Sequence, residues 1–295
     1  MAGVFHAFWR AMPWFDPAGR FSLLKLTALV GTSIPAVWML GEFASGRWDF
    51  PSPYVNLIYH SGLWCTYLLL GCLAVTPIRR ITGMGRLAQL RRLLGVASFA
   101  YCLLHIVAWF GLRFWDWAAL GGELAGRATL WIATVSALLL LALALTSFDR
   151  VIRAMGRRWK QLHGLVYLAA LLAVLHFMLS PGSLQGPPFL MAGLYVWLMG
   201  WRWLERRRLG TQPAALFGLG FAAALFALLI QPLWLVSMQA ERSTQTPLAA
   251  ILDNVNPDIW IYLGVPPVWI LLAWTAVTVT ASLTGSRKTL PNPIS

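Results

Sequence analysis

The chain has 295 residues, of which 59% are hydrophobic and only 11% are charged. A soluble domain carries about 25% charged residues, so this composition excludes an ordinary soluble protein. The formal net charge of +13 comes from short basic clusters between apolar stretches, without a long basic arm. That distribution is typical of membrane orientation signals and excludes nucleic acid as a partner.

Eight apolar stretches are long enough to cross a bilayer, which takes about 20 residues per helix. They cover roughly residues 24–41, 57–76, 93–114, 128–147, 162–180, 188–204, 214–238 and 266–284. We therefore predict an all-α fold, a polytopic transmembrane helical bundle of about eight spans embedded in the lipid bilayer.

Lysine and arginine predict the orientation of these spans. The N-terminus, the loops 77–92, 148–161 and 202–213, and the C-terminus together hold 19 of the 23 basic residues. Because basic loops stay on the cytoplasmic side, both termini should be cytoplasmic, in a membrane of the bacterial inner-membrane type.

Histidines inside the spans are the main candidates for function, because ionisable residues are costly within a bilayer. His105 and His176 should lie about 18 Å and about 21 Å from the inner edge of the membrane, in spans that both run outward. Two imidazoles at matched depth can hold one haem iron from its two axial sides. The alternative is that each histidine only forms hydrogen bonds between packed helices.

Two further histidines lie at span ends. His60 begins the second span near the outer face, where it could lie beside the same haem or replace one ligand. His163 begins the fifth span near the inner face, and about 20 Å along the helix axis separate it from His176. On a straight helix the two side chains would point about 140° apart, so His163 and His176 are better interpreted as two levels of a transfer path.

Other motifs narrow the chemistry. No Cys, Asp or Glu joins the histidines at depth, so zinc is a poorer interpretation than haem. Residues 83–88 read G-x-G-x-x-A, but they follow a membrane span, so a dinucleotide site is rejected. Arg91 and Arg92 open the third span; they are either orientation anchors or cations for a haem propionate, a flavin phosphate or a quinone.

Several short motifs occur in order along residues 20–208 and together resemble the MsrQ (YedZ) family. They are His60-Ser61-Gly62, Thr76-Pro77, Arg91-Arg92-Leu93-Leu94-Gly95 followed by His105, and Trp159-Lys160-Gln161-Leu162-His163 followed by Tyr167 and His176. The family belongs with the ferric-reductase-like transmembrane domains. The resemblance implies a six-helix haem-binding core over 1–208, with two additional helices in 209–295.

The resemblance also implies cofactors and partners. It implies haem b and allows FMN, with electrons taken from the quinone pool or a cytoplasmic flavin reductase. Delivery would be to a periplasmic, molybdopterin-containing methionine sulfoxide reductase subunit, for repair of methionine sulfoxide in proteins. By motif position, His105 and His176 would be the outer-haem ligands and His163 an inner candidate.

Two other functions stay open from the residues themselves. A ferric or other metal reductase would use the same haem without a protein partner. A haem-free transporter or assembly factor would use the histidines as relays or packing residues, but no Asp or Glu lies deep in any predicted span to form a proton pathway.

Overall fold

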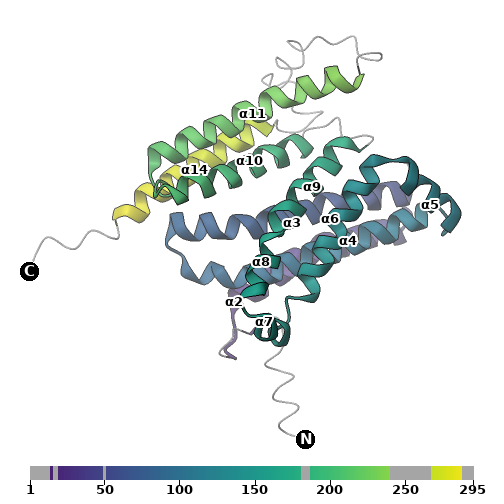
Figure 1. Cartoon of the computed structure of the whole chain (residues 1–295), viewed down its shortest axis with the longest axis horizontal. Coiled ribbons are helices and arrows are strands. Elements are labelled where there is room, and N and C mark those ends of the chain that lie inside the picture. Colours follow the sequence, from purple (N-terminus) through teal and green to yellow (C-terminus); the bar gives the residue numbers. More distant parts are fainter. Residues whose placement is uncertain (1–13, 16–18, 49–50, 181–186, 240–266, 288–295) are drawn as a thin grey trace, which may run out of the picture. The chain divides into compact units, whose positions relative to one another are not determined.

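The computed structural model describes residues 14–15, 19–48, 51–180, 187–239 and 267–287, and these residues form helices joined by short connections (Figure 1). No β-strand occurs within these ranges, where the only extended pairing is an isolated bridge between Phe15 and Phe21. The predicted all-α class is therefore confirmed. Both termini and the predicted outer loop around 240–265 lie outside the described residues, so their sidedness stays a prediction.

Local sequence signals place several helix ends. Four helices begin at a proline: α3 (Pro53–Thr82), α10 (Pro187–Arg206), α11 (Pro213–Gln239) and α14 (Pro267–Arg287). Proline suits the first helical position, because its fixed φ is already helical and its missing N–H has no partner there. Gly83, with a φ of +71°, directly follows α3 and provides the left-handed residue that commonly ends a helix.

The chain divides into two compact units. The first comprises Met1–Val75 and Arg86–Ala173, and the second Thr76–Gly85 and Val174–Ser295. The helices α3 and α9 (Val166–Leu179) each contribute residues to both units. These units are defined by packing, so the division between 1–208 and 209–295, which rests on the resemblance, stays a prediction.

Side-chain hydroxyls connect the helices of the first unit, which contains α2 (Leu23–Ala44), α4 (Leu90–Leu112) and α6 (Ala128–Leu145). The Tyr101 hydroxyl of α4 donates to the Thr32 carbonyl of α2 at 2.7 Å. Ser98 of α4 donates to the Cys65 carbonyl of α3 at 2.8 Å. Small hydroxyl residues allow close helix approach and also supply a bond that lipid cannot.

The second unit contains α10, α11 and α14, which pack against one another and lie side by side in Figure 1. Gly193 of α10 lies so close to Leu271 of α14 that a Cβ there would be 2.5 Å from its Cδ1. The rings of Trp197 and Trp274 meet edge to face at 5.5 Å. Glycine and aromatic rings thus bring these helices together, and the buried hydroxyl residues of α14, Thr275, Thr278 and Ser282, lie among the apolar side chains.

Six helices of the described part are long and apolar enough to cross a membrane. They are Leu23–Ala44, Pro53–Thr82, Gly85–Leu112, Ala128–Leu145, Arg157–Leu179 and Pro213–Ile230; α14 contributes a shorter apolar stretch, Trp269–Thr284. On α2 the exposed side chains Val30, Ile34 and Val37 recur at helical spacing, as a lipid-facing stripe does. The chain is a multi-pass membrane protein, and the exact count of eight spans stays a prediction.

Two features of the path were not expected from the sequence. A helix, α5 (Trp117–Gly126), occupies the connection between the third and fourth predicted spans and begins where the Asp116 side chain accepts from the Ala118 and Ala119 amides. The fifth predicted span is interrupted: α8 (Arg157–Gly164) ends and α9 begins on either side of Leu165. Capping by a side chain and a one-residue helix break leave little trace in hydropathy.

The end of α4 carries bulky residues where glycine is usual. The Phe114 amide donates to the Gly111 carbonyl and the Trp115 amide to the Phe110 carbonyl, which is the Schellman pattern. Phe114 and Trp115 therefore have φ values of +50° and +61°, and the Phe114 side chain is 90% exposed. A left-handed backbone costs a residue with a Cβ about 1 kcal/mol, and the exposed ring recovers little of it through packing.

Replacing Phe114 with glycine should raise the thermal unfolding midpoint of the purified protein by relieving about 1 kcal/mol of backbone strain. Phe114→Ala is the matched control, because it removes the ring but keeps the strained Cβ. A midpoint for Phe114→Gly at or below that of Phe114→Ala would contradict this account of the turn.

Candidate functional site

His105 is held on α4 by a backbone carbonyl of α3. Its Nδ1 lies 2.8 Å from the carbonyl oxygen of Ile58, and the ring is half-buried. Because a carbonyl can only accept, Nδ1 carries the proton in this bond and the Nε2 lone pair is the one available to a metal. Histidines that bind metals usually donate their other ring N–H in this way, which fixes the tautomer and the ring plane.

Gly62 provides the space for the His105 ring. A Cβ built at this position would lie 2.9 Å from Nδ1 and 3.1 Å from Cε1 of His105. Ile58 and Gly62 are four residues apart, so they share one face of α3. That face therefore supplies both the carbonyl that orients the imidazole and the absence of a side chain that lets it approach.

His60 lies on the other side of α3. Two residues of helix rotate a side chain by about 200°, so His60 points away from the face formed by Ile58 and Gly62. Its ring stacks on Trp48 at a centroid distance of 5.3 Å and meets Trp38 edge-on at 5.0 Å. The structure thus places His60 in an aromatic cluster and favours a packing role, while its role as a haem ligand stays a prediction.

His163 is held by its own helix, α8, and by the backbone of Leu143 in α6. Its ring stacks on Trp159 with a centroid distance of 3.9 Å, and its Nδ1 lies 3.2 Å from the Trp159 carbonyl. The Trp159 indole N–H donates to the Thr146 carbonyl at 2.9 Å, which ties α8 to the end of α6. The imidazole is thus bound by backbone groups of both α8 and α6.

His176 lies near the C-terminal end of α9, where the Ser180 hydroxyl donates to its carbonyl at 2.7 Å. It belongs to the second compact unit, whereas His105 and His163 belong to the first. The pairing of His105 with His176 about one haem therefore stays a prediction that rests on their matched depth in the sequence.

Arg91 and Arg92 begin α4, both exposed. Arg92 Nη2 lies 2.5 Å from Asp149 Oδ1 at the start of α7 (Asp149–Met155). The hydrogen bond from Arg92 lowers the pKa of the Asp149 carboxyl, and the positive charges of Arg92, Arg153 and Lys25 add to that effect. The sequence analysis did not single out Asp149; an acidic residue within a strongly basic loop was the signal that could have found it.

The described residues contain no group of three or more His, Cys, Asp or Glu side chains that could hold a metal ion. Haem needs at most two protein ligands, because its porphyrin supplies the other four, so paired histidines suffice.

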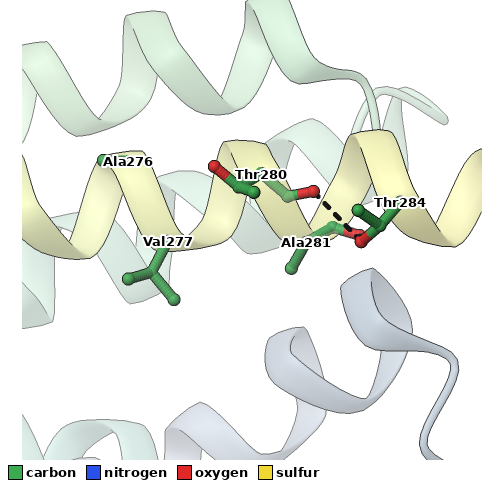
Figure 2. Close-up of a pocket in the computed structure, with 5 residues that line it drawn as sticks. All are labelled: Ala276, Val277, Thr280, Ala281 and Thr284. Atoms are coloured by element: carbon green, nitrogen blue, oxygen red, sulfur yellow. Dashed lines mark hydrogen bonds between the residues drawn. The ribbon is translucent and has the colours of Figure 1, made fainter.

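A surface hollow on α14 is lined by Ala276, Val277, Thr280, Ala281 and Thr284, and the Thr284 hydroxyl donates to the Thr280 carbonyl (Figure 2). None of these five side chains titrates or binds metal, so the hollow supplies no haem ligand.

Known proteins share part of the chain described above, and Gly62, His105 and His163 lie within the segment matched by a family. Residues 61–174 match the family described as ferric reductase like transmembrane component. The chain is 36% identical over 193 residues to a protein of Cronobacter sakazakii named protein-methionine-sulfoxide reductase heme-binding subunit MsrQ, an alignment that covers 65% of this chain and 96% of that protein. The chain belongs to the MsrQ family.

Other MsrQ proteins support the same assignment. Relatives with that printed name are 36% identical over 176 residues in Xanthomonas axonopodis and 35% identical over 202 residues in Azospira oryzae. These alignments cover 59% and 66% of this chain, and 79% and 85% of the relatives. No solved structure matches the chain. The resemblance given by the short motifs is therefore confirmed at the level of the family.

Replacing Gly62 with alanine should disturb the His105 ring, because the new Cβ would lie 2.9 Å from Nδ1. We expect a loss of bound haem, or a shift of its absorption bands, measured on purified protein of equal concentration. Gly71→Ala is the control on the same helix, since a Cβ there would meet nothing within 4 Å. Equal haem content and identical spectra in both variants would contradict the role given to Gly62.

The Arg92–Asp149 pair should contribute little to stability, because the side chains are 52% and 64% exposed and such pairs contribute about 0–1 kcal/mol. Since the native pKa of Asp149 is lowered, its contribution is present above the usual value of 3.8 and is lost as pH falls through the lower native value. We expect Asp149→Asn to be slightly less stable than wild type at pH 7, with the difference vanishing in strong acid. A difference that grows on acidification would contradict this sign.

Proposed function

We propose that this chain is a haem-binding membrane subunit that passes electrons across the bilayer to a methionine sulfoxide reductase. One observation carries the proposal. In a chain of the MsrQ family, His105 donates from Nδ1 to the Ile58 carbonyl and so presents Nε2 as a metal ligand would. The relatives named above are described as heme-binding subunits of such a reductase.

The residues are suited to haem in their chemistry as well as their position. His105 and His176 are the proposed axial ligands of an outer b haem, with Gly62 leaving room for the His105 ring. When bound, the iron would supply reversible one-electron transfer at a potential set by its axial ligands. The role of this chain's own residues is to orient the imidazoles and to keep them in an apolar helical bundle.

The remaining elements of the proposal concern the two membrane faces. Electrons would enter on the cytoplasmic side from the quinone pool or from a flavin reductase, with FMN as a second cofactor near Arg91, Arg92 and His163. They would leave to a periplasmic, molybdopterin-containing catalytic subunit, with the chain in the bacterial inner membrane. The family assignment supports these steps, and the exposed guanidinium of Arg91 supports an anionic group at the inner face.

A second candidate is a ferric or other metal reductase. The match of residues 61–174 to the ferric-reductase-like component favours it. It differs from the first in one observable respect: a metal reductase reduces a metal chelate at the outer face without any protein partner. The relatives named above align with more than half of this chain, and all of them are named MsrQ. The role in methionine sulfoxide reduction therefore ranks first.

The decisive measurement is the dithionite-reduced minus oxidised spectrum of the purified chain. Wild type should show b-type bands, and His105→Ala and His176→Ala should lose them, because each removes an axial ligand. His60→Ala should retain them, since the structure places His60 in the cluster with Trp38 and Trp48.

Folded wild-type protein that stays colourless after haem supplementation would overturn the proposal and favour a transporter or assembly factor. Bands with partner-free reduction of a ferric chelate would select the metal reductase instead. Loss of the bands in His60→Ala, with retention in His105→Ala, would reassign the ligand.

A further inference from the structure

One end of the second unit concentrates positive charge. In the described residues of this unit, six arginines gather near the ends of two helices, and Glu205 is the only acidic residue. We call these six residues the arginine cluster: Arg79 and Arg80 near the end of α3, and Arg202, Arg206, Arg207 and Arg208 near the end of α10. The cluster lies on the side that the basic loops predict to be cytoplasmic.

A single ion pair joins the two helix ends. Arg80 Nη1 lies 2.8 Å from Glu205 Oε1, which brings the end of α3 against the end of α10. This bond uses the only carboxylate among the unit's described residues, so the other arginines are not balanced by it. Arg207 lies over the Trp203 ring at 4.3 Å, a contact that orders the guanidinium without neutralising it.

Arg79 carries an unsatisfied donor. Its Nε is buried and has no hydrogen-bond partner within the described part of the chain. A buried donor of a charged group is costly to leave without an acceptor, more so than a neutral one. Glu205 is bound by the neighbouring Arg80, so an anion from outside the protein is a suitable acceptor for this donor.

Arg208 occupies a position that usually holds glycine. Its amide donates to the Glu205 carbonyl and the Leu209 amide to the Leu204 carbonyl, which is a Schellman pattern with Arg208 in the left-handed conformation at a φ of +62°. The Trp201 indole donates to the Gly210 carbonyl at 2.8 Å and holds the turn. The left-handed backbone thus fixes an exposed arginine directly after the end of α10.

We propose that the arginine cluster binds the phosphate headgroup of an anionic phospholipid of the surrounding bilayer. Planar guanidinium groups form paired hydrogen bonds with phosphate oxygens. A bound phosphate would therefore give Arg79 Nε an acceptor and would also offset the excess positive charge of the cluster. Basic pockets at the cytoplasmic ends of transmembrane helices are known lipid-headgroup sites. The helix α3, which is long and apolar enough to cross a membrane, ends at the cluster and so places it at the level of lipid headgroups.

The test measures the affinity of the full chain, in neutral detergent, for fluorescent phosphatidylglycerol, with phosphatidylcholine as the uncharged comparator. Arg79→Gln should weaken phosphatidylglycerol binding about fivefold, the factor that corresponds to about 1 kcal/mol per basic residue at an anionic surface. Arg158→Gln is the matched control, because it removes the same charge from an exposed position of α8 on the same predicted side. It should change the affinity by less than about twofold, since an exposed charge is largely screened.

A second variant separates binding from folding. Arg208→Gly relieves the left-handed strain and removes a charge, so it should raise the unfolding midpoint while weakening phosphatidylglycerol binding. Phe114→Gly relieves the same kind of strain in the first unit and should leave lipid affinity unchanged. A variant that is more stable and yet binds less cannot be explained by loss of structure.

Two results would overturn the proposal. Equal weakening by Arg79→Gln and Arg158→Gln would show that only the general positive surface attracts the lipid. Competition by millimolar inorganic phosphate, with no preference for phosphatidylglycerol over phosphatidylcholine, would assign the site to a free phosphate rather than a lipid headgroup. Selective weakening by Arg79→Gln and Arg208→Gly, without such competition, supports the lipid site.

Discussion

The backbone of a membrane-embedded chain has to satisfy its polar groups internally, because hydrocarbon offers neither donors nor acceptors. Helices achieve this for the main chain, and the hydroxyl side chains follow the same rule. Ser61 donates to the Leu57 carbonyl at 2.5 Å and Thr66 to the Gly62 carbonyl at 3.0 Å, both one turn back on α3. Where a hydroxyl instead reaches a neighbouring helix, as Tyr101 does to Thr32, it joins two spans. The described helices are therefore held by apolar packing and by a small number of hydroxyl hydrogen bonds.

The same constraint explains how the imidazoles are held. A ring within apolar helices finds few acceptors other than backbone carbonyls, and both His105 and His163 use Nδ1 for one. For His163 this carbonyl lies one turn back on the same helix, at Trp159, and a second backbone hydrogen bond is made with Leu143 of α6. For His105 the carbonyl belongs to another helix, so the orientation of the ring depends on the α3–α4 contact and on Gly62. The orientation of both rings therefore depends on how neighbouring helices pack.

Charges, by contrast, are concentrated at helix ends and at the connections between helices. Arg92 meets Asp149 between α4 and α7, and Arg80 meets Glu205 between α3 and α10. Each pair joins elements that are distant in the sequence, and in the described residues of the second unit the arginines outnumber the one acidic residue, Glu205. Positive charge that is retained in this way orients the chain in the membrane, and at the end of the second unit it also forms a surface with the chemistry of a phosphate site.

The sequence by itself determined the fold class, the positions of the apolar helices and the family, because hydropathy, span length and short motifs are local properties of the chain. It also identified all four intramembrane histidines. It could not distinguish their surroundings, because depth along a helix says nothing about which neighbour a side chain faces. Only the tertiary structure decided that His105 contacts Ile58 and Gly62, that His60 on the opposite face of α3 stacks with Trp48, and that Arg92 engages Asp149. These depend on the rotation and packing of helices against one another, which the sequence of a single helix does not specify.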